Sequence, residues 1–283
     1  MDTYCSEISQ FLHFLSYSAK RPTRRLGEAM FIISIDVDVG SKQLSVVNRV
    51  KNGANVNDIN EHQIGDIEER AFPLFAEVFN DLEVAVTFAI RGQLTQLKNT
   101  ILELLPRFSI KHDIGAHGYY HRTFTDLTRA EADNELHMIS SGMKNFNITP
   151  KSFVFPKNRV AHLDLLAKYG YKCYRGSSGF ANDCMYIEKE DRLFDVHPSL
   201  YLDRVTTCSV FPRKILDIAI ARKLPFHVWF HLWNFGETDE LIKKSISNLI
   251  LPLLKHAKEK EKSGVLMLET MFSAAEKTEK FEV

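Results

Sequence analysis

Apolar and polar positions follow two different periods along the chain, and this predicts alternating strands and helices. Continuous apolar runs of strand length recur, and between them apolar residues are three and four positions apart, as on one face of a helix. The predicted strands are residues 29–37, 82–90, 108–117, 151–156, 171–176, 192–197, 224–232 and 264–270. The predicted helices are residues 66–80, 93–108, 127–146, 159–170 and 238–262. Regular alternation of this kind favours a parallel sheet with right-handed crossovers.

Sequence signals at the helix ends agree with this assignment. Thr128 and Glu131 have the spacing of a capping box, and Gly170 follows the last periodic residue of its helix. No Gly-x-Gly-x-x-Gly motif follows the first strand, so two dinucleotide-binding halves are not predicted. One uninterrupted alternation over residues 29–283 instead predicts an α/β fold with a (β/α) barrel.

Residues 1–28 are predicted to form a separate, short helical extension of the barrel domain 29–283. Apolar residues on one helical face are followed by a basic cluster at Lys20, Arg21, Arg24 and Arg25. We expect the helix to pack on the barrel; the alternative is weak peripheral contact of this segment with an anionic membrane surface. The basic residues follow the apolar part, the reverse of a secretory signal, so a cytoplasmic location is expected.

Composition and charge exclude several classes of function. The chain has 45% hydrophobic and 25% charged residues, as in a soluble globular protein, and no apolar stretch long enough to cross a membrane. Lys and Arg together number 36, and so do Asp and Glu, which argues against a nucleic-acid partner. The four cysteines form no Cys-x-x-Cys pair and are expected to be reduced thiols rather than zinc ligands.

Polar side chains collect where the predicted strands end, which in a parallel barrel is the face that carries active sites. Asp36 and Asp38 end the first strand and point to the same side of it, because side chains alternate along a strand. Two adjacent carboxylates repel each other unless a cation or a shared proton relieves them. A polar strand end with a turn at Gly40 is the alternative interpretation.

Two histidine pairs share the spacing His-x-x-x-His. On a helical turn His117 and His121 would lie on one face and could bind one metal ion, although the spacing alone is weak evidence. His227 and His231 lie in a strand, where we interpret His227 as a core residue and His231, at the strand end, as functional. Two histidines and one carboxylate would leave metal positions open for water and substrate. The second carboxylate could then act as a base, and the separate histidine as an acid.

The segments SIDVDVG, VTFAIRGQL, HGYYH, SFVFP and HVWFHLWNF occur in an order that resembles the polysaccharide deacetylases of the NodB-homology type, carbohydrate esterase family 4. The resemblance covers residues 30–270 and implies a deformed (β/α)7–8 barrel. It implies that Asp36 is the catalytic base and His231 the general acid, and that Asp38, His117 and His121 bind the metal. Candidate substrate-binding residues are Arg91, Tyr120, Pro156, Lys157, Asn158, Arg175, Trp233 and Asn234.

The chain departs from the family pattern at three points. Val37 separates two aspartates that are usually adjacent, and Val154 stands where the family has an arginine that holds the catalytic aspartate. Arg175 or Arg91 could replace that arginine. The motif that orients the acid histidine is missing, with Asp195 a candidate replacement for it.

The resemblance implies a metal-dependent hydrolase that removes an acyl group, acetyl or formyl, from the nitrogen of an amino sugar. One divalent ion is expected, zinc first, although cobalt, nickel, manganese or iron suits the same ligands. The expected substrate is a nucleotide- or lipid-linked intermediate of surface-polysaccharide biosynthesis. The alternatives are a cytosolic amidohydrolase for a small non-sugar amide and an inactive glycan-binding homologue. The sequence indicates no oligomeric state.

Overall fold

The computed structural model describes residues 28–37, 67–96, 100–176, 185–203, 210–236 and 238–281. Its strands are β1 (Ala29–Val37), β2 (Thr87–Ile90), β3 (Asp113–Ala116), β4 (Ser152–Val154), β5 (Cys173–Arg175), β6 (Ile187–Glu190), β7 (Leu193–Val196), β8 (Leu200–Tyr201), β9 (Pro225–His231) and β10 (Leu266–Glu269). The α-helices are α4 (Ile67–Asp81), α5 (Thr100–Leu104), α6 (Arg129–Lys144), α7 (Leu163–Lys168), α8 (Val210–Arg222), α9 (Asp239–Ser245), α10 (Leu251–Lys262) and α11 (Met271–Phe281). The short helical turns are η1 (Gly92–Gln96), η2 (Leu105–Arg107), η3 (Phe124–Asp126), η4 (Pro156–Asn158), η5 (Leu232–Phe235) and the π-helical η6 (Ile246–Ile250).

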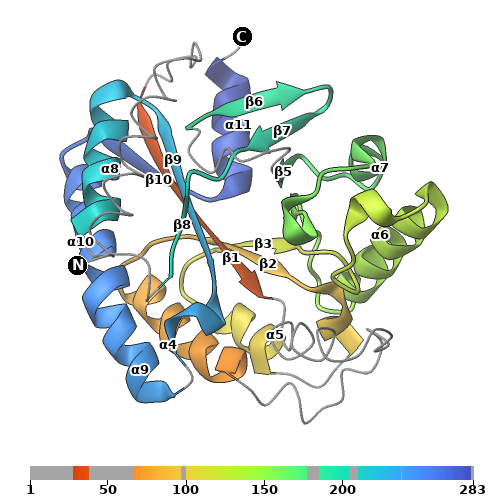
Figure 1. Cartoon of the computed structure of the whole chain (residues 1–283), viewed down its shortest axis with the longest axis horizontal. Coiled ribbons are helices and arrows are strands. Elements are labelled where there is room, and N and C mark those ends of the chain that lie inside the picture. Colours follow the sequence, from red (N-terminus) through yellow and green to blue (C-terminus); the bar gives the residue numbers. More distant parts are fainter. Residues whose placement is uncertain are drawn as a thin grey trace, which may run out of the picture.

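The strands form one curled, mostly parallel sheet with helices around its outside (Figure 1). Their order is β6-β7-β5-β4-β3-β2-β1-β9-β8, and β10 pairs in parallel with the first half of β1. Only the β6–β7 hairpin is antiparallel among the described pairs. The predicted α/β fold with a deformed barrel is therefore confirmed, and the curled sheet takes the form of a half-barrel whose edges are β6 and β8.

β1 lies at the centre of this sheet and is buried along its whole length. A strand covered on both faces requires a continuous apolar run, which explains the sequence of its first half. Phe31, Ile33 and Ile35 pack in the layer between the sheet and the outer helices. Met30 and Ile32 belong to a second apolar cluster on the other face, inside the curl. Because side chains alternate, Ser34 and Asp36 continue the inner row toward the carboxyl end of the strand.

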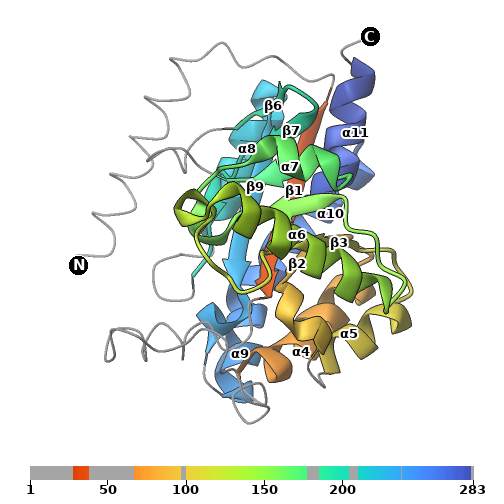
Figure 2. The same cartoon turned by 90° about the vertical axis from the view of Figure 1, so that its right-hand side faces the viewer.

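The inside of the curl is closed at the amino ends of the strands by α11. Figures 1 and 2 show this helix at the start of β1, opposite its arrowhead. Met271, Ala274 and Ala275 of α11 are fully buried and complete the inner apolar cluster. The carboxylate of Asp113, at the start of β3, accepts hydrogen bonds from the Phe272 N–H at 3.3 Å and from two neighbouring hydroxyl groups. The inner row is thus apolar near α11 and polar at the opposite end, where Asp36 lies.

Most predicted elements occur, with five differences. The capping box of Thr128 and Glu131 is present, and α9, η6 and α10 form the long helix predicted over 238–262. The helix predicted over 93–108 is instead divided into η1, α5 and η2, and α8, α11, β6 and β8 were not predicted. The extension 1–28 lies outside the described residues except for Glu28, so its helix and its membrane contact stay predictions. In the described parts of the chain, no helix is long and apolar enough to span a bilayer.

Candidate active site

Asp36 and Arg175 form a buried ion pair at the carboxyl ends of β1 and β5. The Arg175 Nη2 lies 2.6 Å from the Asp36 Oδ2, and the side chains are 0% and 3% exposed, respectively. Arg175 pairs in register with Val154, the position at which the family resemblance expects an arginine. The arginine therefore lies on the neighbouring strand, at the same register position as Val154. Its guanidinium contacts the predicted base, Asp36.

A chain of hydrogen bonds behind Arg175 fixes its guanidinium. Its Nη1 donates to the Ser34 Oγ at 2.8 Å, and the Ser34 Oγ lies 2.7 Å from the His227 Nε2. The His227 Nδ1 lies 3.1 Å from the Val196 carbonyl, so Nδ1 carries the proton and Nε2 accepts the serine hydroxyl. Burial and the charge of Arg175 lower the pKa of His227 to about 3, which keeps the ring neutral. His227 is therefore the core histidine that was predicted, but its contacts are polar.

The electrostatics of Asp36 are set by competing effects. Burial by itself raises the pKa of this carboxyl group, but the charge of Arg175, with contributions from His117 and His231, more than offsets this. The net pKa of Asp36 lies below its ordinary value, so Asp36 is ionised at neutral pH. Its second oxygen, Oδ1, is buried and has no hydrogen-bond partner in the described structure. A buried carboxylate oxygen without a donor requires another polar group or ion to complete it.

His117 lies on the inner row of the sheet just after β3. Its Nε2 is 3.9 Å from the Asp36 Oδ2, and its Nδ1 lies 2.9 Å from the Val154 carbonyl. This contact places the ring proton on Nδ1 and leaves Nε2 as the atom suited to bind a metal ion. The ring of His121 meets that of His117 edge-on, with centroids 4.8 Å apart.

His117 and His121 do not lie on a helical turn. Residues 117–121 form an irregular loop in which Gly118 and His121 have positive φ angles of 65° and 58°. A helical turn, on which this spacing would align the two rings, is therefore not formed, because left-handed residues do not continue a right-handed helix. The loop nonetheless brings the two imidazole rings side by side.

His231 approaches Asp36 from the opposite side, on β9. Its Nε2 is 3.7 Å from the Asp36 Oδ2, and its ring stacks on Trp233 with centroids 4.7 Å apart. The Tyr201 hydroxyl donates to the Asn234 Oδ1 at 2.8 Å and lies 3.5 Å from the His231 Nδ1. Tyr201 of β8 thus contacts the Nδ1 side of the ring, while Trp233 packs on its face. The candidate for orienting His231, Asp195, lies instead 3.5 Å from His197.

The residues at the site fit a divalent metal ion. His117 presents an Nε2 suited to coordination, His121 lies beside it, and the unpaired Asp36 Oδ1 faces the same end of the sheet. Among the described residues, no three His, Cys, Asp or Glu side chains are grouped to hold a metal. Asp38, the predicted third ligand, lies outside the described residues. Its role therefore stays a prediction.

Four of the predicted substrate-binding residues are buried and bound to the protein itself. Arg175 is on Asp36, and Arg91 donates to the Gln93 Oε1 at 2.8 Å and to the Tyr120 carbonyl at 3.2 Å. Asn234 accepts the His231 N–H at 2.9 Å, and Pro156 is buried under the Gly118 loop. These side chains shape the site rather than line it, because Arg91, Arg175 and Asn234 are hydrogen-bonded within the protein and Pro156 packs under the loop.

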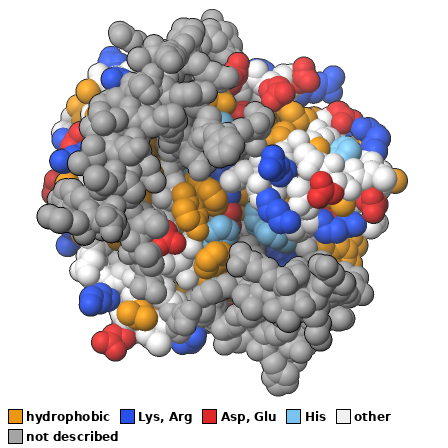
Figure 3. Space-filling view, viewed as in Figure 1, with side chains coloured by type: hydrophobic (Ala, Val, Ile, Leu, Met, Phe, Trp, Pro, Cys, Tyr) orange, Lys and Arg blue, Asp and Glu red, His pale blue; other side chains and the backbone are white. Residues whose placement is uncertain are grey.

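The other four predicted residues lie nearer the surface. Lys157 is exposed, and Tyr120, Asn158 and Trp233 are partly exposed. Lys157 and Asn158 both have positive φ angles, of 55° and 53°, so the backbone after β4 turns sharply at the edge of the site. Figure 3 shows histidine side chains reaching the surface near the centre of this face, beside hydrophobic and basic side chains.

The comparisons with known proteins establish the fold. No protein-family model and no curated protein matches the sequence. A solved structure described as a putative polysaccharide deacetylase from Mycobacterium smegmatis superposes with a TM-score of 0.71 over 93% of this chain and 96% of that one, at 15% identity. The chain has the polysaccharide deacetylase fold. The fold that the resemblance implies is thus confirmed by the three-dimensional structure.

Two further structures show the range of proteins with the polysaccharide deacetylase fold. An allantoinase superposes with a TM-score of 0.61 at 10% identity, over 93% of this chain and 95% of that one. A mutant of a carbohydrate esterase family 4 pseudoenzyme, described as having restored activity, gives a TM-score of 0.51 at 12% identity over 88% and 68% of the two chains. These superpositions establish the architecture. At identities this low, activity and substrate have to be argued from the residues of this chain.

Proposed function

We propose that the protein is a metal-dependent hydrolase that removes an acyl group from the nitrogen of an amino sugar. The observation that carries the proposal is the convergence of two histidines on one buried carboxylate. The Nε2 atoms of His117 and His231 lie 3.9 and 3.7 Å from the Asp36 Oδ2, and Arg175 holds that oxygen from behind. A base, an acid and a metal-binding histidine at one strand end are the parts that amide hydrolysis requires.

In the proposed reaction each group has a separate task. A divalent ion held by Asp38, His117 and His121 would supply an acidified water and polarise the acyl carbonyl. Asp36 accepts a proton from the attacking water, and it is available as a base because Arg175 keeps it ionised. His231 donates a proton to the leaving nitrogen from the other side, so that the amine departs neutral. The backbone N–H of Lys157 is our candidate donor to the developing oxyanion.

Several features support a sugar as the substrate. Trp233 is partly exposed and stacks on His231, and Tyr120 is partly exposed in the loop between His117 and His121. Aromatic faces suit the stacking of a sugar ring. Lys157 is an exposed cation at the same edge and suits a phosphate on a nucleotide- or lipid-linked sugar. We propose a cytoplasmic intermediate of glycan synthesis on this basis, with acetyl or formyl as the acyl group and zinc as the first metal to test.

Two other functions are each favoured by a specific observation. The similarity to an allantoinase structure favours hydrolysis of a small non-sugar amide. The similarity to a mutant of a family 4 pseudoenzyme favours the inactive homologue, for which we propose glycan binding as the function. The ionised, buried Asp36 argues against the second, because binding alone does not require a base inside the sheet.

One experiment separates the three functions. Purified protein is analysed for metal and then assayed for acetate and formate release from N-acylated sugar nucleotides, N-acylated lipid-linked sugars and small amides including allantoin. Asp36→Asn should retain the metal and the fold but lose at least about 10²-fold in kcat, and His117→Ala should lose the metal. Turnover of only the non-sugar amides would replace the proposal with the first alternative. Glycan binding without any turnover would replace it with the second.

A further inference from the structure

The loop that carries the two histidines has a conformation that it would not adopt by itself. Gly118 and His121 both have left-handed φ angles, of 65° and 58°. Glycine tolerates this conformation, but a histidine does not favour it, because the Cβ crowds the backbone. A β-carbon at position 118 would lie 2.9 Å from the Pro156 ring, so the close approach also requires glycine. The surroundings must therefore hold the loop in shape.

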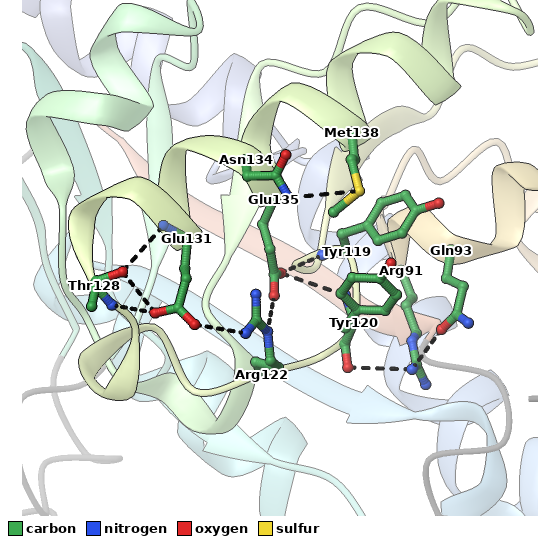
Figure 4. Close-up of polar contacts among 10 residues, drawn as sticks. All are labelled: Arg91, Gln93, Tyr119, Tyr120, Arg122, Thr128, Glu131, Asn134, Glu135 and Met138. Atoms are coloured by element: carbon green, nitrogen blue, oxygen red, sulfur yellow. Dashed lines mark hydrogen bonds and ion pairs between the residues drawn. The ribbon is translucent and has the colours of Figure 1, made fainter. Parts of the chain in front are cut away.

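The carbonyl groups of the loop are bound from the β2 side. The carbonyl oxygens of residues 118, 119 and 120 accept hydrogen bonds from the Gly92 N–H, the Gln93 N–H and the Arg91 guanidinium, respectively, at 2.8, 3.2 and 3.2 Å. Figure 4 shows Arg91 and Gln93 on this side of the loop. One edge of the loop backbone is therefore fixed by the segment that follows β2.

The opposite edge is bound by one side chain, Glu135 of α6. Its Oε2 accepts hydrogen bonds from the backbone N–H of Tyr119 at 2.9 Å and of Tyr120 at 3.4 Å, and its Oε1 accepts from the Arg122 Nε at 2.6 Å (Figure 4). The side chain is 0% exposed. Every described hydrogen bond of the Glu135 carboxylate is thus made to residues 119–122.

Helix α6 itself has no need of a carboxylate at this position. The other buried residues of the helix are Ala132, Leu136, Ile139 and Met143, all apolar. Burying a charge is costly unless it is fully paired, so Glu135 is an exception on an otherwise apolar face. Its contacts explain the exception, because they satisfy two loop amides that α6 would otherwise bury.

We propose that Glu135 is a positioning residue for the metal site: it holds residues 117–121 in the shape that aims both imidazole rings at one divalent ion. This rests on the proposed function, because it assumes that His117 and His121 bind a metal. Glu135 itself does not coordinate the ion. His117 keeps its own anchor on the Val154 carbonyl, so the loss of Glu135 should disturb the loop without releasing that ring.

The test compares zinc affinity in five purified proteins: the wild type, Glu135→Met, Glu135→Gln, Glu131→Gln and Leu253→Ala. Methionine has a similar size but no acceptor, whereas glutamine retains one acceptor and is the milder variant. Glu131 is the matched control, because it lies one turn earlier on α6, also contacts Arg122, at 3.4 Å, and is 46% exposed. Zinc dissociation constants are measured by competition with a chromophoric chelator. Amide hydrogen exchange of Tyr119 and Tyr120 is measured in the metal-free proteins.

We expect zinc binding to weaken by roughly 10–100-fold in Glu135→Met, the range for residues that support metal ligands, and by less in Glu135→Gln. The Tyr119 and Tyr120 amides should exchange faster in both, and Glu131→Gln should match the wild type. Leu253→Ala in α10 controls for general instability, because it removes a buried side chain without touching the loop.

The possible failures are distinguishable. Wild-type zinc affinity in both Glu135 variants would overturn the positioning role while leaving the proposed function intact. An equal loss of zinc affinity in Leu253→Ala would also overturn it, because stability alone would then explain the effect. Absence of zinc binding by the wild type would overturn the proposed metal site and the positioning role together. If Glu135→Met does not fold, Glu135→Gln decides.

Discussion

The ion pair of Asp36 and Arg175 should be the most sensitive electrostatic contact in the protein. Replacing Arg175 by Met removes the positive charge but keeps an apolar side chain of comparable length inside the sheet. Asp36 would then be a buried carboxylate without its closest counter-charge, and breaking such a pair costs about 3–5 kcal/mol. The free energy of unfolding of a domain is about 5–15 kcal/mol, so a large part of it would be lost.

A matched surface pair shows how much of this effect comes from burial. Arg129 and Asp164 are also 2.6 Å apart, but both side chains are 62% exposed. Exposed ion pairs contribute at most about 1 kcal/mol, so Arg129→Met should change the unfolding free energy by less than that. The two ion pairs that these variants remove therefore differ in burial but have the same distance between the charged atoms.

The double variant Asp36→Asn/Arg175→Met tests whether the loss comes from the unpaired charge. Removing both charges leaves no buried ion, so the double variant should be more stable than the sum of the single variants implies, by at least about 2 kcal/mol. Unfolding is followed at equilibrium in urea by fluorescence and circular dichroism for all four combinations. Additive losses, or a loss in Arg175→Met no larger than in Arg129→Met, would refute the reasoning.

The pH dependence gives a second check with a definite sign. Asp36 has a lowered pKa in the folded protein, so its contribution to stability is present above its unfolded pKa and is lost as pH falls through the folded pKa. In Arg175→Met, burial would act without the main opposing charge and the pKa should rise. The stability difference between the wild type and Arg175→Met should therefore be larger at pH 7 than at pH 4, where the variant can protonate its carboxylate.

Three further predictions concern other parts of the structure. His227 is held neutral with a pKa of about 3, so lowering the pH from 7 to 5 should destabilise the wild type by about 2 kcal/mol more than His227→Gln. Urea unfolding at several pH values measures this difference, and parallel pH profiles of the two proteins would contradict the prediction. Tyr201→Phe removes the hydroxyl beside the His231 Nδ1 and should lower kcat about 3–10-fold with little change in KM. The effect should be absent from Tyr169→Phe, which removes a partly buried hydroxyl bonded to the Asp133 carbonyl. Asp113→Ala removes an acceptor from the first turn of α11 and should lower the free energy of unfolding by about 1–3 kcal/mol, whereas Asp113→Asn should lower it by less. In Asp113→Ala, limited proteolysis should cut α11 first. Unchanged resistance to proteolysis would show that the helix is held by packing alone.

The sequence by itself determined the local order of the fold. The apolar run of β1 followed by Asp36 required a strand buried on both faces with a carboxylate at its end. Helical periodicity located α6, and Thr128 with Glu131 fixed its first turn, because a capping box involves only residues three apart. His231 could be separated from His227 by position alone, since strand ends in a parallel sheet meet at one edge.

The tertiary structure decided the contacts between segments that are distant in the sequence. Arg175 binds Asp36 across 139 positions, and no periodicity could have chosen it over Arg91, because a pattern reports which face of a strand is buried but not which strand is its neighbour. The shape of the 117–121 loop could not be predicted for a related reason: the spacing of two histidines carries no information about the Glu135 carboxylate, which binds the loop from another element. Interactions between residues close in the sequence therefore determined the secondary-structure elements and the position of each side chain along its strand. Only tertiary packing brought Arg175, His117 and His231 within 4 Å of one oxygen atom, the Asp36 Oδ2.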